Sequence, residues 1–356
     1  MKVLLLGEFS GLHKNLKEGL LELGHDVTIA SSGDGWKSIK SDLNIGPSRK
    51  GILRKPSGLW SILRAVPMLK DYDVVQIVSP TVFPRVFGIN KAILRYIFNK
   101  NKKVFLVGAG CNDSGTADFF ENGLKYPQFY KEIKKSNPRM WIQSEKGRKF
   151  NDWIFQKING FIPIMYEYAE GYRRIGYKKL CPTVPIPINT DSVQYTKNKV
   201  NGRLVVFHGL NREGVKGTPI IRKAMERLQN EFPDDVECII DGKMPLDEYL
   251  SVLERVNVVV DQVYSVSVGV NGVYNLAMGK VVVGGGEMEF LEEFGLDRSP
   301  LIPIEPTVED VYEKLKSLVG CNEYLEELGQ RSRAFAENLH DYKKVAQSYV
   351  DIWSAN

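Results

Sequence analysis

Short apolar runs alternate with helical patterns along the first half of the chain. Segments such as 12–24 and 145–158, whose apolar residues recur at the helical period, separate these runs. Parallel strands need long crossover connections, which are usually helices, so this alternation favours a parallel sheet in an α/β fold. The expected strands are rich in β-branched residues and lie at 2–6, 26–30, 73–78, 103–107 and 161–165.

The second half repeats this pattern after an interruption. Residues 181–202 are rich in proline, asparagine and threonine and show no helical period, so they are expected to link two domains. A chain of 356 residues also exceeds what one core usually supports. The pattern predicts two Rossmann-like domains, at 1–190 and 200–338. Strands of the second are expected at 204–208, 236–241, 256–261, 280–284 and 300–304, with helices at 217–230, 245–255, 270–278, 287–295 and 307–319.

Two strand-to-helix turns in the second half carry the candidate chemistry. In HGLNREGVKGT (208–218), a strand runs into a glycine turn that contains Arg212 and Lys216 and precedes a helix. Two cations beside the free N–H groups of a helix start are suited to hold a phosphate. In DQVYSVSVGVNGVYNLAMGK (261–280), a second helix is expected to begin near Gly269, Val270 and Asn271. Both turns should lie at the carboxyl edge of the sheet, where open parallel sheets bind ligands.

These two segments resemble the C-terminal half of GT-B nucleotide-sugar glycosyltransferases, in particular the retaining, family 4-like enzymes of bacterial surface-polysaccharide assembly. The resemblance implies two parallel sheets facing across a cleft, a terminal helix at 339–356 that crosses back to the first domain, and a donor diphosphate held by Arg212 and Lys216. One departure is Tyr274, which stands where the family usually has an acidic residue that binds donor hydroxyls. The likeness rests on Arg212, Lys216-Gly217-Thr218, Asp261-Gln262, Ala277, Gly279 and Lys280.

The same resemblance assigns residues around the donor and the acceptor. The acceptor side is expected at Glu8, Ser10 and Asp113. Asp113 is a candidate catalytic residue with Arg212 and Lys216, and for it two interpretations stay open: it orients an acceptor hydroxyl, or it only caps a turn. Residues expected near the donor sugar or nucleoside are Gly11, His208, Gly209, Gly242, Tyr274 and Asn275.

Neither a cofactor nor a metal ion is expected. The first turn contains Gly7 and Gly11 but lacks G-x-G-x-x-G, which disfavours a dehydrogenase. The only D-x-D motif, Asp71-Tyr72-Asp73, precedes a strand and so falls at the amino edge of the sheet, away from the ligand-binding edge. Four scattered cysteines indicate reduced, structural thiols. The leaving diphosphate would then be neutralised by the protein alone.

Charge is divided unevenly between the two halves. Residues 1–195 hold 30 Lys and Arg against 17 Asp and Glu, which suggests an anionic partner. Nucleic acid is disfavoured because no binding motif appears. The better candidates are an anionic membrane surface and a polyprenyl-diphosphate-linked or glycan acceptor. The segment 49–70 places Leu59, Trp60, Leu63 and Val66 on one helical face, and 91–103 is a second basic, apolar stretch; packing on the sheet and membrane contact stay open for both.

No run of 18 or more apolar residues occurs, and residues 1–11 indicate a first strand and turn, so a cytoplasmic protein is expected, peripheral on the inner membrane face in the alternative. The sequence thus favours a metal-independent glycosyltransferase. A nucleotide-sugar epimerase of the same fold and a non-catalytic nucleotide-sugar-binding protein remain alternatives. The donor base, the sugar, the acceptor, the linkage and the oligomeric state are not encoded in these patterns.

Overall fold

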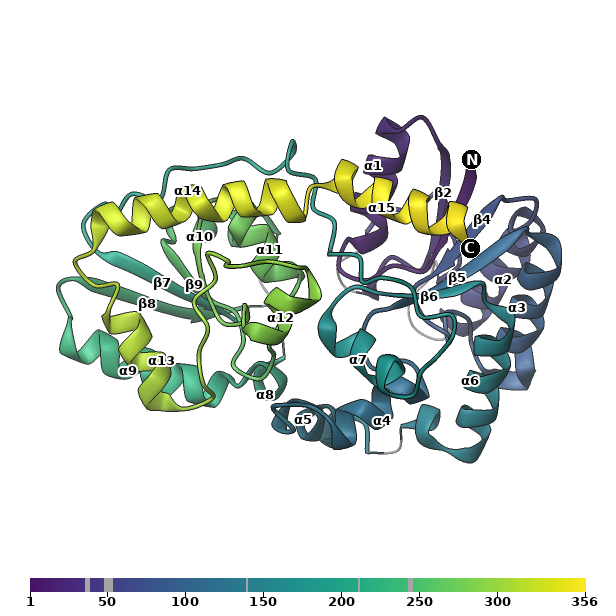
Figure 1. The fold of residues 1–356 in the computed structure, drawn as a ribbon, viewed down its shortest axis with the longest axis horizontal. Helices are drawn as coiled ribbons and strands as arrows, with labels where there is room; N and C mark the ends of the chain where they lie inside the picture. Colours follow the sequence, from purple (N-terminus) through teal and green to yellow (C-terminus); the bar gives the residue numbers. More distant parts are fainter. Residues whose placement is uncertain (36–38, 48–53, 139, 211, 243–245) are drawn as a thin grey trace. The chain divides into compact units, whose positions relative to one another are not determined.

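The chain forms two compact units in the computed structural model (Figure 1). Unit 1 comprises 1–119, 140–189 and 342–356, and unit 2 comprises 120–139 and 190–341. Residues 120–138, expected in the first domain, group with unit 2 in the structure. The structure describes residues 1–35, 39–47, 54–138, 140–210, 212–242 and 246–356.

A six-stranded parallel sheet forms the centre of unit 1, in the order β3-β2-β1-β4-β5-β6. The five strands expected from the sequence are all present, and β3 is an additional short edge strand. Their side chains are almost entirely buried, as expected for a parallel sheet covered on both faces. The strands are β1 (Lys2–Leu6), β2 (Asp26–Ser31), β3 (Leu43–Asn44), β4 (Val74–Ile77), β5 (Lys103–Gly108) and β6 (Gly160–Pro163).

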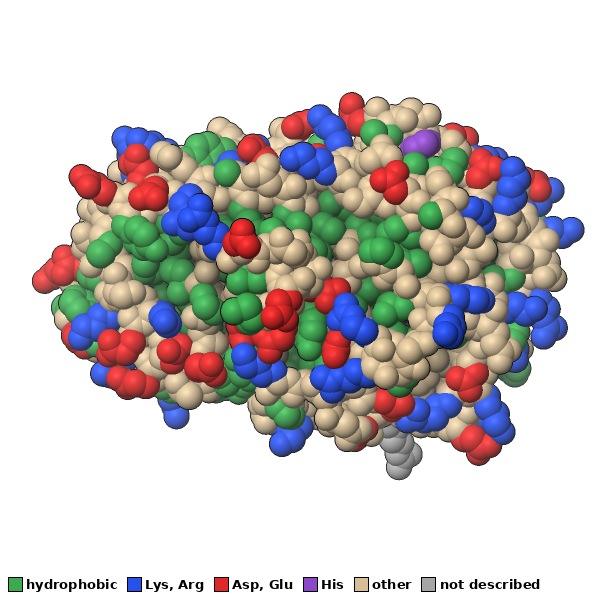
Figure 2. All heavy atoms as spheres, viewed as in Figure 1, with side chains coloured by type: hydrophobic (Ala, Val, Ile, Leu, Met, Phe, Trp, Pro, Cys, Tyr) green, Lys and Arg blue, Asp and Glu red, His purple; other side chains and the backbone are tan. Residues whose placement is uncertain are grey.

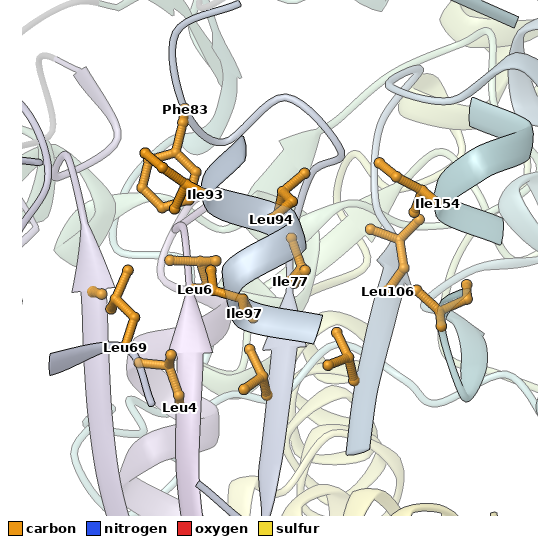
Figure 3. Packing of buried hydrophobic residues seen from close by; sticks show 14 of the residues in the cluster. Leu4, Leu6, Leu69, Ile77, Phe83, Ile93, Leu94, Ile97, Leu106 and Ile154 are labelled. Atoms are coloured by element: carbon orange, nitrogen blue, oxygen red, sulfur yellow. The ribbon is translucent and has the colours of Figure 1, made fainter. Parts of the chain in front are cut away.

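Helices cover both faces of this sheet. On one face, α1 (Leu12–Glu22) packs beside the terminal helix α15 (Tyr342–Ala355), and residues such as Leu16, Tyr349 and Trp353 share one core cluster. The other face is covered by α2 (Arg54–Ala65), α3 (Ile89–Lys100) and α6 (Glu145–Lys157). Figure 3 shows how α3 directs Ile93, Leu94 and Ile97 onto the strands, and its labelled residues also include Leu4, Leu6, Leu69, Ile77, Phe83, Leu106 and Ile154.

Unit 2 contains a four-stranded parallel sheet in the order β10-β9-β7-β8. Its strands are β7 (Leu204–Gly209), β8 (Val236–Asp241), β9 (Val258–Val260) and β10 (Val281–Val283). The prediction of a strand at 300–304 was wrong, because this segment makes only an isolated bridge between Ile302 and Val283. The predicted α/β fold with two parallel sheets is confirmed.

The helices of unit 2 contribute apolar side chains to its core and charged side chains to its surface. Apolar residues of α9 (Thr218–Glu231), α13 (Val308–Lys316) and α14 (Asn322–Leu339) pack on the sheet. Outside, charges of both signs are interspersed over α9 and α13 (Figure 2), with ion pairs Arg227–Glu309 and Lys316–Glu231. The remaining helices are α5 (Gln128–Ser136), α8 (Glu213–Lys216), α10 (Leu246–Arg255), α11 (Val270–Ala277) and α12 (Met288–Glu293). Among the described residues, no helix is long and apolar enough to cross a membrane.

Candidate functional site

The first predicted phosphate turn follows β7 and contains two cations in different environments. Arg212 is exposed and caps α8, a single helical turn in which the Lys216 N–H donates to the Arg212 carbonyl at 3.0 Å. Gly217 then adopts φ 75°, a left-handed conformation that suits glycine, and α9 begins at Thr218. One cation therefore faces solvent at this carboxyl edge, whereas the side chain of Lys216 is buried.

Lys216 forms a buried ion pair that the sequence did not reveal. Its Nζ lies 2.9 Å from Oδ1 of Asp261, the residue after β9, and the two side chains are 7% and 2% exposed. Oδ2 of Asp261 also accepts from the Gly269 N–H, and Oδ1 accepts from Asn271 Nδ2, both at 3.4 Å. Burial alone would raise the pKa of Asp261, but Lys216 and these donors more than offset it, so the pKa is lowered. Asp261 thereby joins the two turns that are predicted to bind phosphate.

His208 is fully buried and both of its ring nitrogens have partners. Nδ1 lies 2.8 Å from the Val260 carbonyl oxygen, and Nε2 lies 2.8 Å from Oγ1 of Thr218. Burial lowers the pKa of His208 to about 4, so the ring is neutral near pH 7. The ring ties the ends of β7 and β9 to the start of α9, and its 0% exposure leaves no surface for a donor. The ring therefore has a structural role, and the donor contact expected at His208 stays a prediction.

The second predicted phosphate turn lies at the start of α11. Gly269 caps the helix in an extended conformation, and Val270 and Asn271 form its first turn. Tyr274 is half-buried, and burial raises its pKa. Asn275 is fully buried; its Nδ2 donates to the Asn271 carbonyl at 2.8 Å, while its Oδ1 has no hydrogen-bond partner among the described residues. Asn275 therefore supports the helix from inside.

The two remaining donor-side glycines end neighbouring strands. Gly209 is the last residue of β7, and Gly242 directly follows β8. A Cβ on Gly242 would lie 2.5 Å from the Leu210 carbonyl oxygen, so the close approach of the two strand ends requires glycine there. These positions put backbone rather than side chains at this part of the carboxyl edge.

A third corner of unit 2 follows β10 and was not among the predicted donor or acceptor residues. Three consecutive glycines, Gly284 to Gly286, all adopt positive φ after β10 and lead to Glu287. The Glu287 carboxylate accepts from Tyr126 Oη at 2.9 Å and from Lys125 Nζ. Burial raises the pKa of Glu287, although both partners act to lower it. No sequence signal links residues 125 and 126 to Glu287, because they belong to a segment expected in the other domain.

The two carboxylates of unit 1 that were expected on the acceptor side both lie at helix starts. Glu8, 5% exposed, accepts from the N–H groups of His13 at 3.3 Å and Lys14 at 2.9 Å, and burial raises its pKa. Ser10 and Gly11 form the preceding turn with φ 53° and 85°. Glu8 therefore neutralises the start of α1, a favourable place for an anion.

Asp113 has the same arrangement at α4 (Ser114–Asn122). Its Oδ1 accepts from the Thr116 N–H at 2.8 Å and from Tyr172 Oη at 2.6 Å, and its Oδ2 accepts from Thr116 Oγ1 at 2.9 Å. The carboxylate is 3% exposed, and burial raises its pKa. Of the two interpretations left open by the sequence, this geometry favours the cap over orientation of an acceptor hydroxyl.

Unit 1 also contains a pocket of about 480 Å³ between α4, α6 and α7 (Tyr166–Arg174). Phe155 and Tyr172, which stack with their centroids 4.8 Å apart, belong to its lining. None of the residues predicted from the sequence lines it.

The described residues contain no group of three or more His, Cys, Asp or Glu that could hold a metal ion. Asp73 of the D-x-D motif accepts hydrogen bonds from the Lys2 N–H and from Lys102 Nζ.

No protein-family profile and no curated protein matches the sequence. The fold, however, is similar over 100% of both chains to several solved structures. Three of them are Anabaena HepE in complex with UDP and glucose (TM-score 0.64, 11% identity), sucrose-phosphate synthase from Thermosynechococcus elongatus (0.62, 14%), and UDP-GlcNAc 2-epimerase from Neisseria meningitidis bound to UDP-GlcNAc (0.55, 13%). At these identities the likeness establishes the fold: two parallel α/β units of the kind found in GT-B proteins.

Proposed function

We propose that this chain is a metal-independent glycosyltransferase that moves a sugar from a nucleotide-sugar donor to a glycan or lipid-linked acceptor in polysaccharide synthesis. One observation carries the proposal: the carboxyl edge of the unit 2 sheet presents exposed Arg212 one helical turn from Lys216, which Asp261 holds in place. Cations beside helix starts suit the diphosphate of such a donor. The fold shared with proteins that bind UDP and UDP-sugars supports it.

The chemistry would depend on stabilising the leaving group. As the bond from the sugar carbon to the diphosphate oxygen breaks and the acceptor oxygen takes its place, negative charge grows on the diphosphate. Arg212 can donate to two of its oxygens at once. An ammonium has three N–H donors, and Asp261 accepts one from Lys216, which leaves two for phosphate. Asp261 would thus be a positioning residue.

No side chain is assigned as the base for the acceptor hydroxyl. The proton of this hydroxyl would pass to an oxygen of the leaving diphosphate, which becomes more basic as the bond to the sugar breaks. The oxygens of Glu8 and Asp113 are engaged at helix starts, so positioning and leaving-group stabilisation would supply the rate enhancement. In line with the resemblance to retaining enzymes, we propose retention of anomeric configuration. The linkage of the product, determined by NMR, tests that part separately.

A nucleotide-sugar epimerase is the second candidate, and one cluster favours it. Four titratable side chains lie together near the end of β10: Lys125, Tyr126, Glu287 and Glu289. An epimerase needs such groups for proton transfer to and from the sugar. A non-catalytic binding protein is the third, motivated by Tyr274 in place of an acidic residue. These candidates differ in turnover.

The deciding experiment combines binding with turnover. UDP, GDP, dTDP, ADP and CMP, with their sugars, are screened by thermal shift, where a ligand at a hundred times its Kd stabilises by about 2.7 kcal/mol. A transferase then releases nucleotide only with an acceptor, an epimerase changes the sugar without one, and a binding protein shifts the melting temperature without turnover. If no nucleotide or nucleotide sugar shifts it, the proposed function is contradicted.

A further inference from the structure

Two long segments of unit 1 contain no acidic residue. Residues 43–70 hold six Lys and Arg, and residues 74–112 hold six more, with neither Asp nor Glu in either segment. The first segment contains α2, and the second contains α3. Both helices cover the same face of the sheet, because Ile62 of α2 and Ile93 of α3 belong to one core cluster. Neither helix contains an acidic residue, and their exposed cations include Lys55 and Arg64 on α2 and Lys91, Arg95 and Lys100 on α3.

The outward face of α2 is apolar where solvent-facing positions are expected. Ile62 and Ala65 are buried against the sheet. Leu59, Trp60 and Leu63 lie away from them and are 42%, 64% and 57% exposed. A helix on the surface of a globular protein usually carries polar side chains opposite its buried stripe, as α9 and α13 do in Figure 2. Packing within unit 1 does not account for these three side chains.

A second apolar projection precedes α3. Val86 is 60% exposed and Phe87 is 100% exposed, so the phenylalanine ring is not packed within the protein. Phe87 also adopts φ 51°, a left-handed conformation that is unfavourable for an aromatic residue, directly before Gly88 at φ 70°. Both features count against folding stability, and packing within unit 1 does not offset them at Phe87.

We propose that the outward face of α2 and the tip at Val86 and Phe87 form a docking surface for an anionic phospholipid bilayer. Exposed cations, including Lys55 and Arg64 on α2, would attract anionic headgroups, and the apolar side chains would insert between them. A surface with one sign of charge complements such a bilayer better than an ordinary protein surface of mixed charge. The inference deepens the proposed function, because a lipid-linked acceptor is presented at a bilayer.

The test is co-sedimentation of the full chain with phosphatidylcholine vesicles that contain or lack phosphatidylglycerol, without nucleotide or acceptor. We expect binding to the anionic vesicles, weaker binding as salt increases, and little binding to neutral vesicles. Trp60→Ser with Phe87→Ser should reduce the partition coefficient at least about tenfold, because the salt-independent apolar part is lost. Ile175→Ser, which changes a residue 69% exposed outside this surface, is the matched control and should bind as the wild type does.

Three results would overturn the inference: no binding to anionic vesicles, equal binding to both vesicle types, or equal loss in the double variant and the Ile175 control. Light scattering identifies a protein interface instead. If the double variant changed the oligomeric state but not vesicle binding, the surface would bind a second copy of the chain. Because no sugar substrate is present, a negative result leaves the proposed transferase activity standing, and a positive one does not establish it.

Discussion

The buried pair of Lys216 and Asp261 can be tested by Lys216→Met. Methionine retains most of the side-chain volume but leaves Asp261, 2% exposed, without its cation. Removing one partner of a buried ion pair typically costs about 3–5 kcal/mol. With a urea m-value of about 2 kcal/mol per molar, the unfolding midpoint of unit 2 should fall by about 2 M. Urea unfolding is followed by fluorescence and circular dichroism, because two units need not unfold in one transition.

The pH dependence of the same variant has a defined sign. In the wild type the pKa of Asp261 is lowered, so its pairing stabilises the fold above the unfolded-state pKa and is lost as pH falls through the folded value. In Lys216→Met, burial should instead raise the pKa of Asp261. Protonation of Asp261 then removes the unpaired buried charge and makes the variant less unstable. The difference in free energy of unfolding between the wild type and Lys216→Met should therefore become smaller as the pH falls from about 7 to about 4. Lys216→Met with Asp261→Leu should recover much of the loss. Identical urea curves for wild type and Lys216→Met at neutral pH would refute the buried pair.

Three further predictions concern other residues of the two units. Thr218→Val leaves Nε2 of His208 without its partner and should lower the free energy of unfolding by about 1–3 kcal/mol in thermal unfolding. Asp113→Ala removes the cap of α4 and should cost about 0.5–2 kcal/mol by urea unfolding while nucleotide affinity stays unchanged; lost affinity would mean that capping is not its only role. Sugar transfer should persist in chelator and in Asp73→Asn, and a strict requirement for Mg²⁺ or Mn²⁺ would contradict metal independence.

The sheet strands could be predicted because their signal is local. Each is a short apolar run bounded by turn residues, and the expected strand at 236–241 coincides with β8. The segment 300–304 is also apolar but begins with Pro300 and contains Pro303, and proline cannot donate to a strand ladder. The packing of 120–139 with unit 2 was not predictable, since it depends on contacts far apart in the sequence.

The candidate site was predicted as positions but not as contacts. The strand-turn-helix pattern placed Arg212 and Lys216 at the correct edge of the sheet, because parallel strands all end there. It could not show that Lys216 pairs with Asp261, which is 45 residues away, or that Glu287 meets Tyr126 across 161 residues. The burial of His208 is equally a tertiary effect. A residue at a strand end appears similar in sequence whether its ring faces the ligand or the core.

The central claim is that Arg212 binds the diphosphate of a nucleotide sugar, and calorimetric titration of Arg212→Ala tests it most directly. Arg203→Ala is the matched control, because Arg203 is also exposed but precedes the first residue of β7, at the opposite edge of the same sheet. A charge-assisted hydrogen bond is worth about 1.5–3 kcal/mol, so Arg212→Ala should raise the Kd of the nucleoside diphosphate by about 10- to 150-fold. Arg203→Ala should bind it as the wild type does. Equal affinities in the two variants would contradict the account.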